Sequence, residues 1–250
     1  MSYLAYAIAR DPGPDLPATS SEGVPLDRVV ADGLEAIVSV VPAGYATPGL
    51  PRLQAYARTV DELHRRGTVL PLRFGCLLET AGEIAALLDG RRAEFLAALD
   101  QVDGCEEMGL RVWLGTDAAP PPPEALAAAG PHRPGAGLAY LAARRARLAQ
   151  QDARGAKADQ AVTRIRDALR GTYVRYLVRD PGVGPLVALN FLIRREDRDP
   201  FWEAFERLQE QGCDPVLLSG PWPPYHFVSP PPEPTGALSL GPTHSAARTE

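Results

Sequence analysis

The second half of the chain constrains the fold most, because strand-like and helix-like hydrophobic patterns follow one another there in a fixed order. Strand patterns are expected at 106–114, 172–179, 185–194 and 214–219, and helical spacing at 137–170 and 199–211. This β-α-β-β-α-β order predicts a ferredoxin-like domain. We expect Pro181–Gly182 to join the middle strands as a hairpin, and the long helix to be interrupted near Gly155.

The first half predicts a smaller unit of mixed strands and helices. Strands are expected at 3–9, 33–42 and 68–75, an amphipathic helix between Pro51 and Gly67, and two helical pieces broken at Asp89–Gly90. The predicted fold class is therefore α+β with two domains. These are an N-terminal domain at 1–103 and a ferredoxin-like domain at 104–229 with a Pro-rich loop at 119–136. A disordered tail is expected at 230–250.

Composition places the chain among ordinary globular proteins. Of its 250 residues, 45% are hydrophobic and 23% charged, and no apolar run approaches the roughly 20 residues that cross a bilayer. The N-terminus lacks the basic and apolar regions of a signal peptide, so a cytoplasmic protein with no membrane association is expected. The three cysteines, Cys76, Cys105 and Cys213, are widely spaced, which predicts buried free thiols rather than a disulfide framework or a zinc cage.

The charge is unevenly distributed. Residues 1–103 carry 9 Arg against 14 Asp and Glu, which accounts for the whole net charge of −5. The long helix instead holds eight cations against three acids, and is either a site for an anionic partner or a solvated face with internal ion pairs. Nucleic acid is not expected, because the protein is acidic and the spacing of Tyr173 and Tyr176 should place their rings on opposite faces of a strand.

Catalytic motifs are absent from the sequence. There is no nucleophile elbow and no phosphate loop, and "GVGPLVA" leads into a strand instead of the helix that a dinucleotide needs. His64 stands near a helix C-terminus, where the helix dipole favours a cation, so we expect a structural role. The adjacent acids Asp61–Glu62 and Glu106–Glu107 should face different ways and form no acid–base dyad. We therefore expect no catalytic residue, metal site or cofactor.

Two short stretches remain. "VLPLRFG" places Arg73 within an apolar strand, where it should pair with a buried carboxylate or reach a cleft. "SGPWPPYHFV" places Trp222, Tyr225 and Phe227 among three prolines after the last strand. These rings either fold back and seal a core or contact a partner.

Together these segments resemble the gas vesicle protein GvpF/GvpL family. The resemblance rests, in order, on "YLAYAIA", "GLEAIVSVVP", "LQAYARTVDELHRRGTVLPLRFG", "EEMGLRVWL", "GLAYLAARR" and "LSGPWPPYHFV". The first motif, Val69–Gly75, and the second motif, Gly220–Phe227, are its most distinctive parts, and together the segments cover about 1–228. The motif residues that become candidates for a structural or partner-contact role are Leu70, Pro71, Arg73, Phe74, Gly75, Gly220, Pro221, Trp222, Pro223, Pro224, Tyr225 and Phe227.

The resemblance implies a non-enzymatic accessory or minor structural protein of gas vesicles, without a cofactor. Its implied partners are the hydrophobic shell subunit, whose nucleation or assembly it would assist, and other gas vesicle accessory proteins. It also implies two α+β domains, the second ferredoxin-like.

Two alternatives come from the residues alone. One is a small-molecule enzyme or ligand-binding protein that uses a cleft between the domains, with Arg73 holding a carboxylate or phosphate. It is disfavoured because no nucleophile–base pair is found. The other is an RNA-binding module built on the Arg-rich helix, which the acidic balance disfavours.

Overall fold

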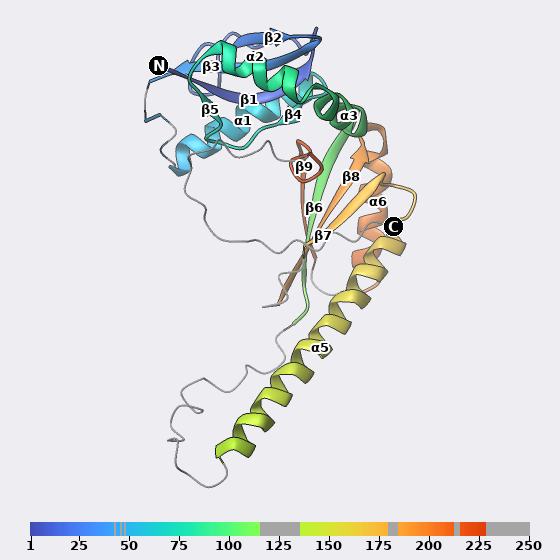
Figure 1. Ribbon diagram of the computed structural model, residues 1–250. Coiled ribbons are helices and arrows are strands. Elements are labelled where there is room, and N and C mark those ends of the chain that lie inside the picture. Colours follow the sequence, from blue (N-terminus) through green and yellow to red (C-terminus); the bar gives the residue numbers. More distant parts are fainter. Residues whose placement is uncertain are drawn as a thin grey trace. The chain divides into compact units, whose positions relative to one another are not determined.

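The computed structural model describes residues 1–42, 44, 45, 47, 49–115, 136–179, 185–212 and 216–228 (Figure 1). The described chain forms two compact units. The first unit holds Met1–Met108, Leu192–Glu196 and 220–228, and the second holds the described residues of Gly109–Phe191 and Asp197–Ser219. The expected tail, Cys213, the Pro181–Gly182 turn and all but the last residue of the Pro-rich loop lie outside the described residues.

An antiparallel sheet forms the centre of the first unit. Its strands are β1 (Ser2–Arg10), β2 (Asp27–Ala31), β3 (Leu34–Val41), β4 (Leu70–Pro71) and β5 (Leu77–Leu78). They lie in the order β2-β3-β1-β4, and β5 also pairs with β1. β1 is therefore the central strand.

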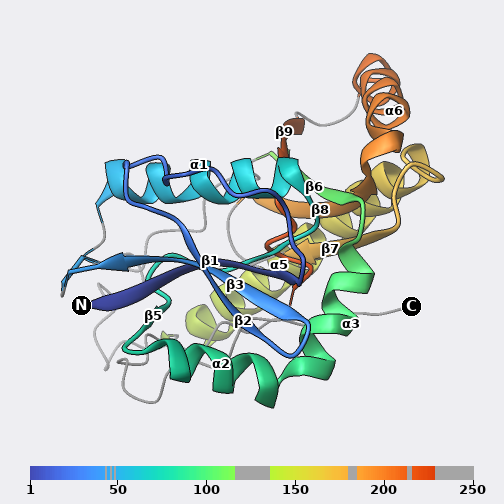
Figure 2. The same ribbon diagram turned by 90° about the horizontal axis from the view of Figure 1, so that it is seen from above.

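Helices cover both faces of this sheet, which explains why β1 and β3 are buried almost throughout (Figure 2). α1 (Leu50–Arg66) lies on one face, and α2 (Ala81–Gly90) lies on the other, followed by α3 (Arg92–Val102). α1 has a proline in its first turn and buries Tyr56, Val60 and Leu63 at helical spacing. The break at Asp89–Gly90 is confirmed by the separate α2 and α3.

The first unit departs from the predicted strands at two places. β2 was not expected, although Asp32 and Gly33, with φ of 42° and 79°, form the tight turn that pairs it with β3. The predicted strand at 68–75 is only Leu70–Pro71, because the chain turns at Phe74–Gly75 and then pairs again as β5. The sequence "ADG" between apolar runs was the signal for the missed hairpin.

A second sheet contains β6 (Cys105–Trp113), β7 (Arg175–Arg179), β8 (Leu186–Arg194) and β9 (Val216–Trp222) in the order β7-β8-β6-β9. The helices α5 (Ala136–Ala168) and α6 (Arg198–Glu210) occur between them, so the predicted order of elements in this half is confirmed. β9 runs through Trp222, so the expected end of this strand at residue 219 is wrong, and Gly220 and Pro221 lie within it.

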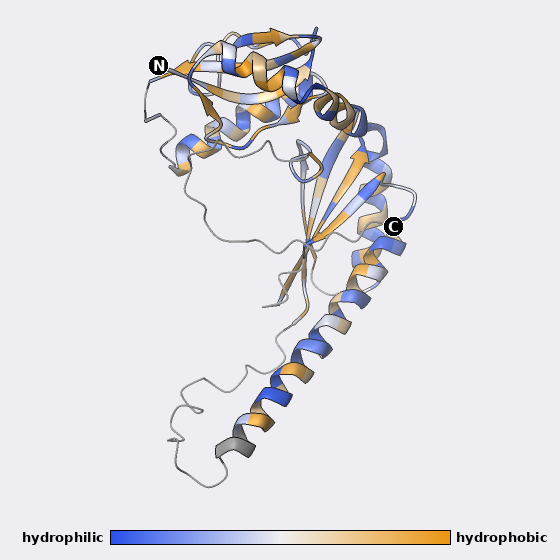
Figure 3. Ribbon diagram, viewed as in Figure 1, coloured by the Kyte–Doolittle hydropathy of each residue, from blue (hydrophilic) through white to orange (hydrophobic). Residues whose placement is uncertain are grey.

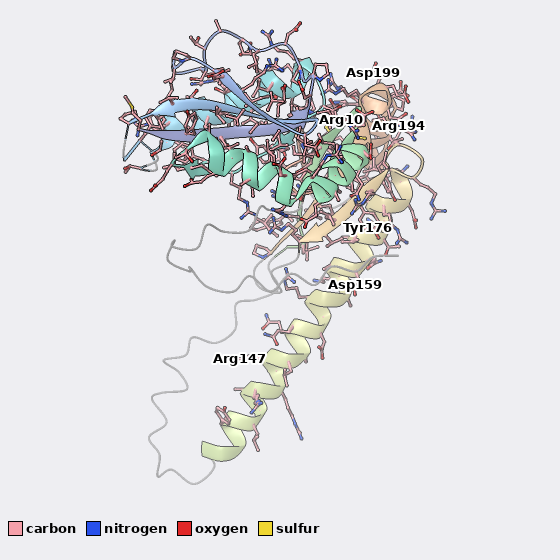
Figure 4. All side chains as sticks on the ribbon, turned by 45° about the horizontal axis from the view of Figure 1, so that its top comes forward. Arg10, Arg147, Asp159, Tyr176, Arg194 and Asp199 are labelled. Atoms are coloured by element: carbon pink, nitrogen blue, oxygen red, sulfur yellow. The ribbon has the colours of Figure 1, made fainter. Side chains whose placement is uncertain are left out.

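The long helix α5 has no interruption at Gly155, contrary to the sequence expectation. Ala158, Ala161 and Ile165 are buried, whereas no residue from 140 to 157 is. This exposed stretch is mostly hydrophilic (Figure 3), and Figure 4 labels Arg147 within it and Asp159 beyond it. Helix propensity therefore contributes much of what maintains α5 through Gly155, because this stretch buries no side chain in a core.

The two tyrosines expected on opposite faces lie on the same side. Tyr173 precedes β7 instead of belonging to it, and the rings of Tyr173 and Tyr176 both contact Phe191, at centroid distances of 5.1 and 6.1 Å. Phe191 is fully buried, so both rings pack on a core side chain. No helix of the described chain is long and apolar enough to cross a membrane.

Candidate functional site

The two distinctive motifs, about 150 residues apart in sequence, meet at one cavity of the first unit. The cavity has a volume of about 370 Å³. Its lining comes from β1, the first motif, α3 with its preceding residue, and the end of the second motif: Ile8, Leu70, Pro71, Leu72, Arg73, Arg91, Glu94, Phe95, Ala97, Ala98, Gln101, Tyr225, Phe227 and Val228. Five of the twelve motif residues selected from the sequence are among them.

Backbone pairing and one tyrosine hold the first motif in place. Leu70 and Pro71 pair with β1, and the Leu72 N–H donates to the Tyr6 carbonyl at 2.9 Å. The Tyr56 hydroxyl donates to the Ala5 carbonyl at 2.8 Å and lies 3.1 Å from the Leu72 carbonyl. Burial raises the pKa of Tyr56 well above its usual value, and nearby Tyr225 adds to this effect, so the hydroxyl stays a donor.

The end of the first motif turns the chain away from the sheet. The Phe74 ring packs edge-on against Tyr56 at 5.3 Å between ring centroids. Gly75 follows with a φ of 94°, a conformation that costs an L side chain but not glycine. Burial raises the pKa of the next residue, Cys76, and disfavours its reactive thiolate.

The second motif is buried at its end and exposed at its start. Pro223, Pro224 and Phe227 are buried, Tyr225 packs against the core beside α1, and Trp222 is 49% exposed. The expectation that all three rings seal a core therefore holds for Phe227 and Tyr225 and is wrong for Trp222. Burial raises the pKa of Tyr225, and the negative charges of Asp61 and Glu107 raise it further.

Gly220 and a buried carboxylate fix the second motif to β6. Gly220 has a φ of 126°, and a Cβ there would lie 2.8 Å from the Glu107 carbonyl oxygen and 3.0 Å from the Met108 sulfur. The Glu107 side chain is 3% exposed; it accepts a bond from the His226 N–H at 2.9 Å and lies 2.5 Å from His226 Nδ1. Pro221, next to Gly220, is exposed. Glu106 and Glu107 are both buried, and Glu107 has a structural role through its contacts with His226.

Arg73 does not lie in a strand and pairs with no buried carboxylate of the described residues, so one of its two expected roles is wrong. It follows β4, is exposed, and lines the cavity. Its guanidinium makes no hydrogen bond or ion pair with any other residue that the structure describes. It therefore fulfils the other expectation and reaches a cavity.

A second arginine, which the sequence did not single out, lines the same cavity. Arg91 Nε and Nη2 donate to Glu94 at 2.9 and 2.5 Å, and its guanidinium lies over the Phe95 ring, 5.0 Å from the centroid. Its third nitrogen, Nη1, is buried and has no hydrogen-bond partner within the described part of the chain. No sequence signal identifies Arg91, because "GRRAEF" resembles any exposed start of a helix.

His64 is structural, but it is not the cation expected at the end of α1. Burial, followed by the charge of Arg195, lowers its pKa from 6.5 to about 3. Arg195 instead donates to the carbonyls of His64 and Arg65, which are among the last carbonyls of α1. The arginine therefore supplies the positive charge that the helix dipole favours.

The cavity thus offers positive charge and apolar walls. Among the described residues, no cluster of three or more His, Cys, Asp or Glu could hold a metal ion. Such an arrangement is suited to binding an anionic group beside apolar surface.

Comparison with known proteins gives the family. The model of the family described as gas vesicle synthesis protein GvpL/GvpF matches residues 2–229. Gas vesicle protein F of Streptomyces sp. (strain CB03234) is 29% identical over 242 residues, covering 91% of this chain and all of that protein. Gas vesicle protein L of the same strain is 29% identical over 246 residues, covering 89% and 91%.

Solved structures agree with this assignment at the level of the fold. The crystal structure of GvpF from Anabaena sp. PCC7120 superposes with a TM-score of 0.66 at 15% identity, covering 91% of this chain and 98% of that one. GvpF from Microcystis aeruginosa gives a TM-score of 0.67 at 16% identity, covering 91% and 99%. The chain belongs to the GvpL/GvpF family of gas vesicle synthesis proteins, which supports a role related to gas vesicles.

Proposed function

We propose that this chain is a non-enzymatic accessory protein that binds the hydrophobic shell subunit of gas vesicles and assists its nucleation or assembly. The observation that carries the proposal is the family match over residues 2–229, which includes both motifs and the whole lining of the cavity. A cytoplasmic protein associated with forming vesicles, and contacts with other accessory proteins, belong to the same proposal.

Physical chemistry supports such a role. A subunit that assembles into a gas-tight wall must expose apolar surface and unpaired strand edges beforehand, and such surfaces aggregate unless they are held. The first unit offers a cavity with apolar walls beside β4, the last strand of its sheet. An extended or helical segment can be held there through side-chain contacts.

We further propose that the architecture comprises two domains, at 1–103 and 104–229, the second ferredoxin-like. The element order β6-α5-β7-β8-α6-β9 and the strand order β7-β8-β6-β9 support the second assignment.

A second candidate function is the binding of a small anionic ligand. Arg73, which has no partner among the described residues, favours it, as does the unpartnered Nη1 of Arg91 in the same cavity. A metabolite that copurifies with the chain and is lost on Arg73→Gln would support this candidate.

Capture of the shell subunit tests the main proposal. Immobilised full-length chain should retain purified shell subunit from solution, and an unrelated protein of net charge −5 should not. Deleting the gene and imaging cells by electron microscopy should show fewer or malformed vesicles. Normal vesicles together with no capture would rule out an assembly role.

A further inference from the structure

Positive charge collects in the cavity where the two motifs meet. Two guanidinium groups, Arg73 and Arg91, line it with one carboxylate, Glu94. Glu94 accepts from Arg91 through two nitrogens and is itself 64% exposed. One positive charge is therefore left without a counter-charge in the lining, which is the condition under which a cavity attracts an anion.

The two arginines differ in a way that suits binding. Arg91 is only 18% exposed, and Glu94 and the Phe95 ring fix its plane. Its buried Nη1 lacks an acceptor in the described chain, and leaving a buried donor unpaired costs about 1–3 kcal/mol. Arg73 is exposed and unrestrained by any described partner, so it can reorient toward an incoming group.

The remaining lining is mostly apolar. Besides the polar Gln101 and Tyr225, it is formed by apolar residues: Ile8, Leu70, Pro71, Leu72, Phe95, Ala97, Ala98, Phe227 and Val228. A small free acid would satisfy the arginines but leave these walls in water. A peptide segment with one acid among apolar residues would cover both parts of the lining.

The position of the cavity also favours a peptide. Leu70 and Pro71 belong to β4, which lies at the end of the strand order β2-β3-β1-β4 and has no further strand beside it in the described chain. A segment that enters the cavity therefore lies beside the strand that ends this strand order. The volume of about 370 Å³ suits one or two side chains rather than a whole helix.

We propose that this cavity binds an Asp or Glu side chain presented on an apolar segment of the shell subunit, with Arg73 and Arg91 holding the carboxylate. The inference rests on the proposed function, because that function supplies the partner. It adds the chemistry of the contact. The carboxylate accepts two hydrogen bonds from one guanidinium or one from each of the two, and apolar side chains lie beside it.

Capture of purified shell subunit by the immobilised full-length chain is the first test. Arg73→Gln and Arg91→Gln should each weaken capture about 10-fold, as expected from loss of a charge-assisted hydrogen bond, and Arg73→Lys should recover part of it. The matched control is Arg92→Gln. Arg92 is the neighbour of Arg91 but pairs with Asp32 and does not line the cavity, so capture should be unchanged.

A competition assay identifies the occupant. The acetylated and amidated peptide Leu-Val-Glu-Val-Leu should displace the shell subunit, and its Gln twin should do so at least 10-fold less well. Equal competition by the Gln twin, or by hexanoate at the same concentration, would overturn the proposal. A several-fold rise in capture by the chain shortened to 1–229 would also overturn it, because the chain's own tail would then be the occupant.

The two proposals fail in different ways. If wild-type chain captures the shell subunit but Arg73→Gln and Arg91→Gln capture it equally well, the cavity inference is wrong and the proposed function stands. If wild-type chain captures no shell subunit, the proposed function is wrong, and the inferred occupant is wrong with it. Equal melting temperatures of the variants, measured by circular dichroism, exclude unfolding as the cause of lost capture.

Discussion

At the scale of single residues, the second motif contains two aromatic side chains with opposite surroundings. Phe227 is 6% exposed and Trp222 is 49% exposed. We expect Phe227→Ala to lower the free energy of unfolding by about 3–5 kcal/mol and Trp222→Ala by less than about 1 kcal/mol. Urea denaturation of both variants measures the difference. If Trp222→Ala costs as much as Phe227→Ala, Trp222 seals a core after all.

His64 makes the stability depend on pH. Its pKa is about 3 in the folded chain and about 6.5 when unfolded, so below pH 6.5 the unfolded chain binds a proton that the folded chain does not. The contribution of neutral His64 to the free energy of unfolding is therefore fully present above pH 6.5. It is lost on acidification, at up to about 1.4 kcal/mol per pH unit until pH 3 is approached.

The variant His64→Gln cannot take up this proton. Its stability should fall less steeply than that of the wild type between pH 6.5 and 4.5, and the difference should reach about 2–3 kcal/mol. Urea denaturation at several pH values measures both slopes, and comparing slopes removes the cost of the substitution itself. Parallel slopes would mean that His64 titrates normally in the folded chain.

At the scale of elements, α5 shows a helix that crosses a glycine without a break. A Cβ at Gly155 would meet no atom within 4 Å. Gly155→Ala should therefore stabilise the helix by about 0.5–1 kcal/mol, because alanine loses less backbone entropy than glycine. Amide hydrogen exchange near residue 155 should slow about 2- to 5-fold, and the matched reverse change, Ala156→Gly, should speed it. If exchange near residue 155 does not slow in Gly155→Ala, the helix is broken at Gly155.

The elements also show what the sequence could and could not predict. The order of strands and helices in 104–229 followed from hydrophobic period alone, because each element there is long enough for the period to be read. β4 and β5 have two residues each, which is too short for any period, and they exist because β1 offers them backbone partners. The break expected in α5 came from weighting one glycine above the strong helix formers around it.

The candidate site was predictable in part for a related reason. Arg73, Tyr225 and Phe227 stand in unusual local sequences, so they could be selected without knowledge of the fold. Arg91 and Phe95 stand in an ordinary amphipathic sequence, and only the packing of α3 brings them to the cavity. The contact of buried Glu107 with His226 joins residues 119 positions apart in sequence, a separation over which local sequence patterns carry no information.

At the scale of the whole molecule, the chain returns to its first unit near the end of its described length. Residues 220–228 belong to that unit and supply Tyr225, Phe227 and Val228 to the cavity lining. Residues 105–108 and 192–196 also belong to it and contribute the Glu107 carboxylate and the Arg195 cap on α1. A unit assembled from three separate stretches, 1–108, 192–196 and 220–228, should depend on all of them.

Truncation from the C-terminus tests this dependence. The chain cut to 1–229 is the reference, because the family match ends at residue 229. Removing 220–250 deletes buried Phe227 with its neighbours, so it should cost at least about 3 kcal/mol, or roughly 6–12 °C for a chain of this size. For the same reason, the isolated stretch 1–103 should melt well below the full chain, since it lacks residues 104–108 and the two later stretches of the unit. Full stability of 1–103 would show that this part folds without them and that the returning segment serves only to complete the cavity.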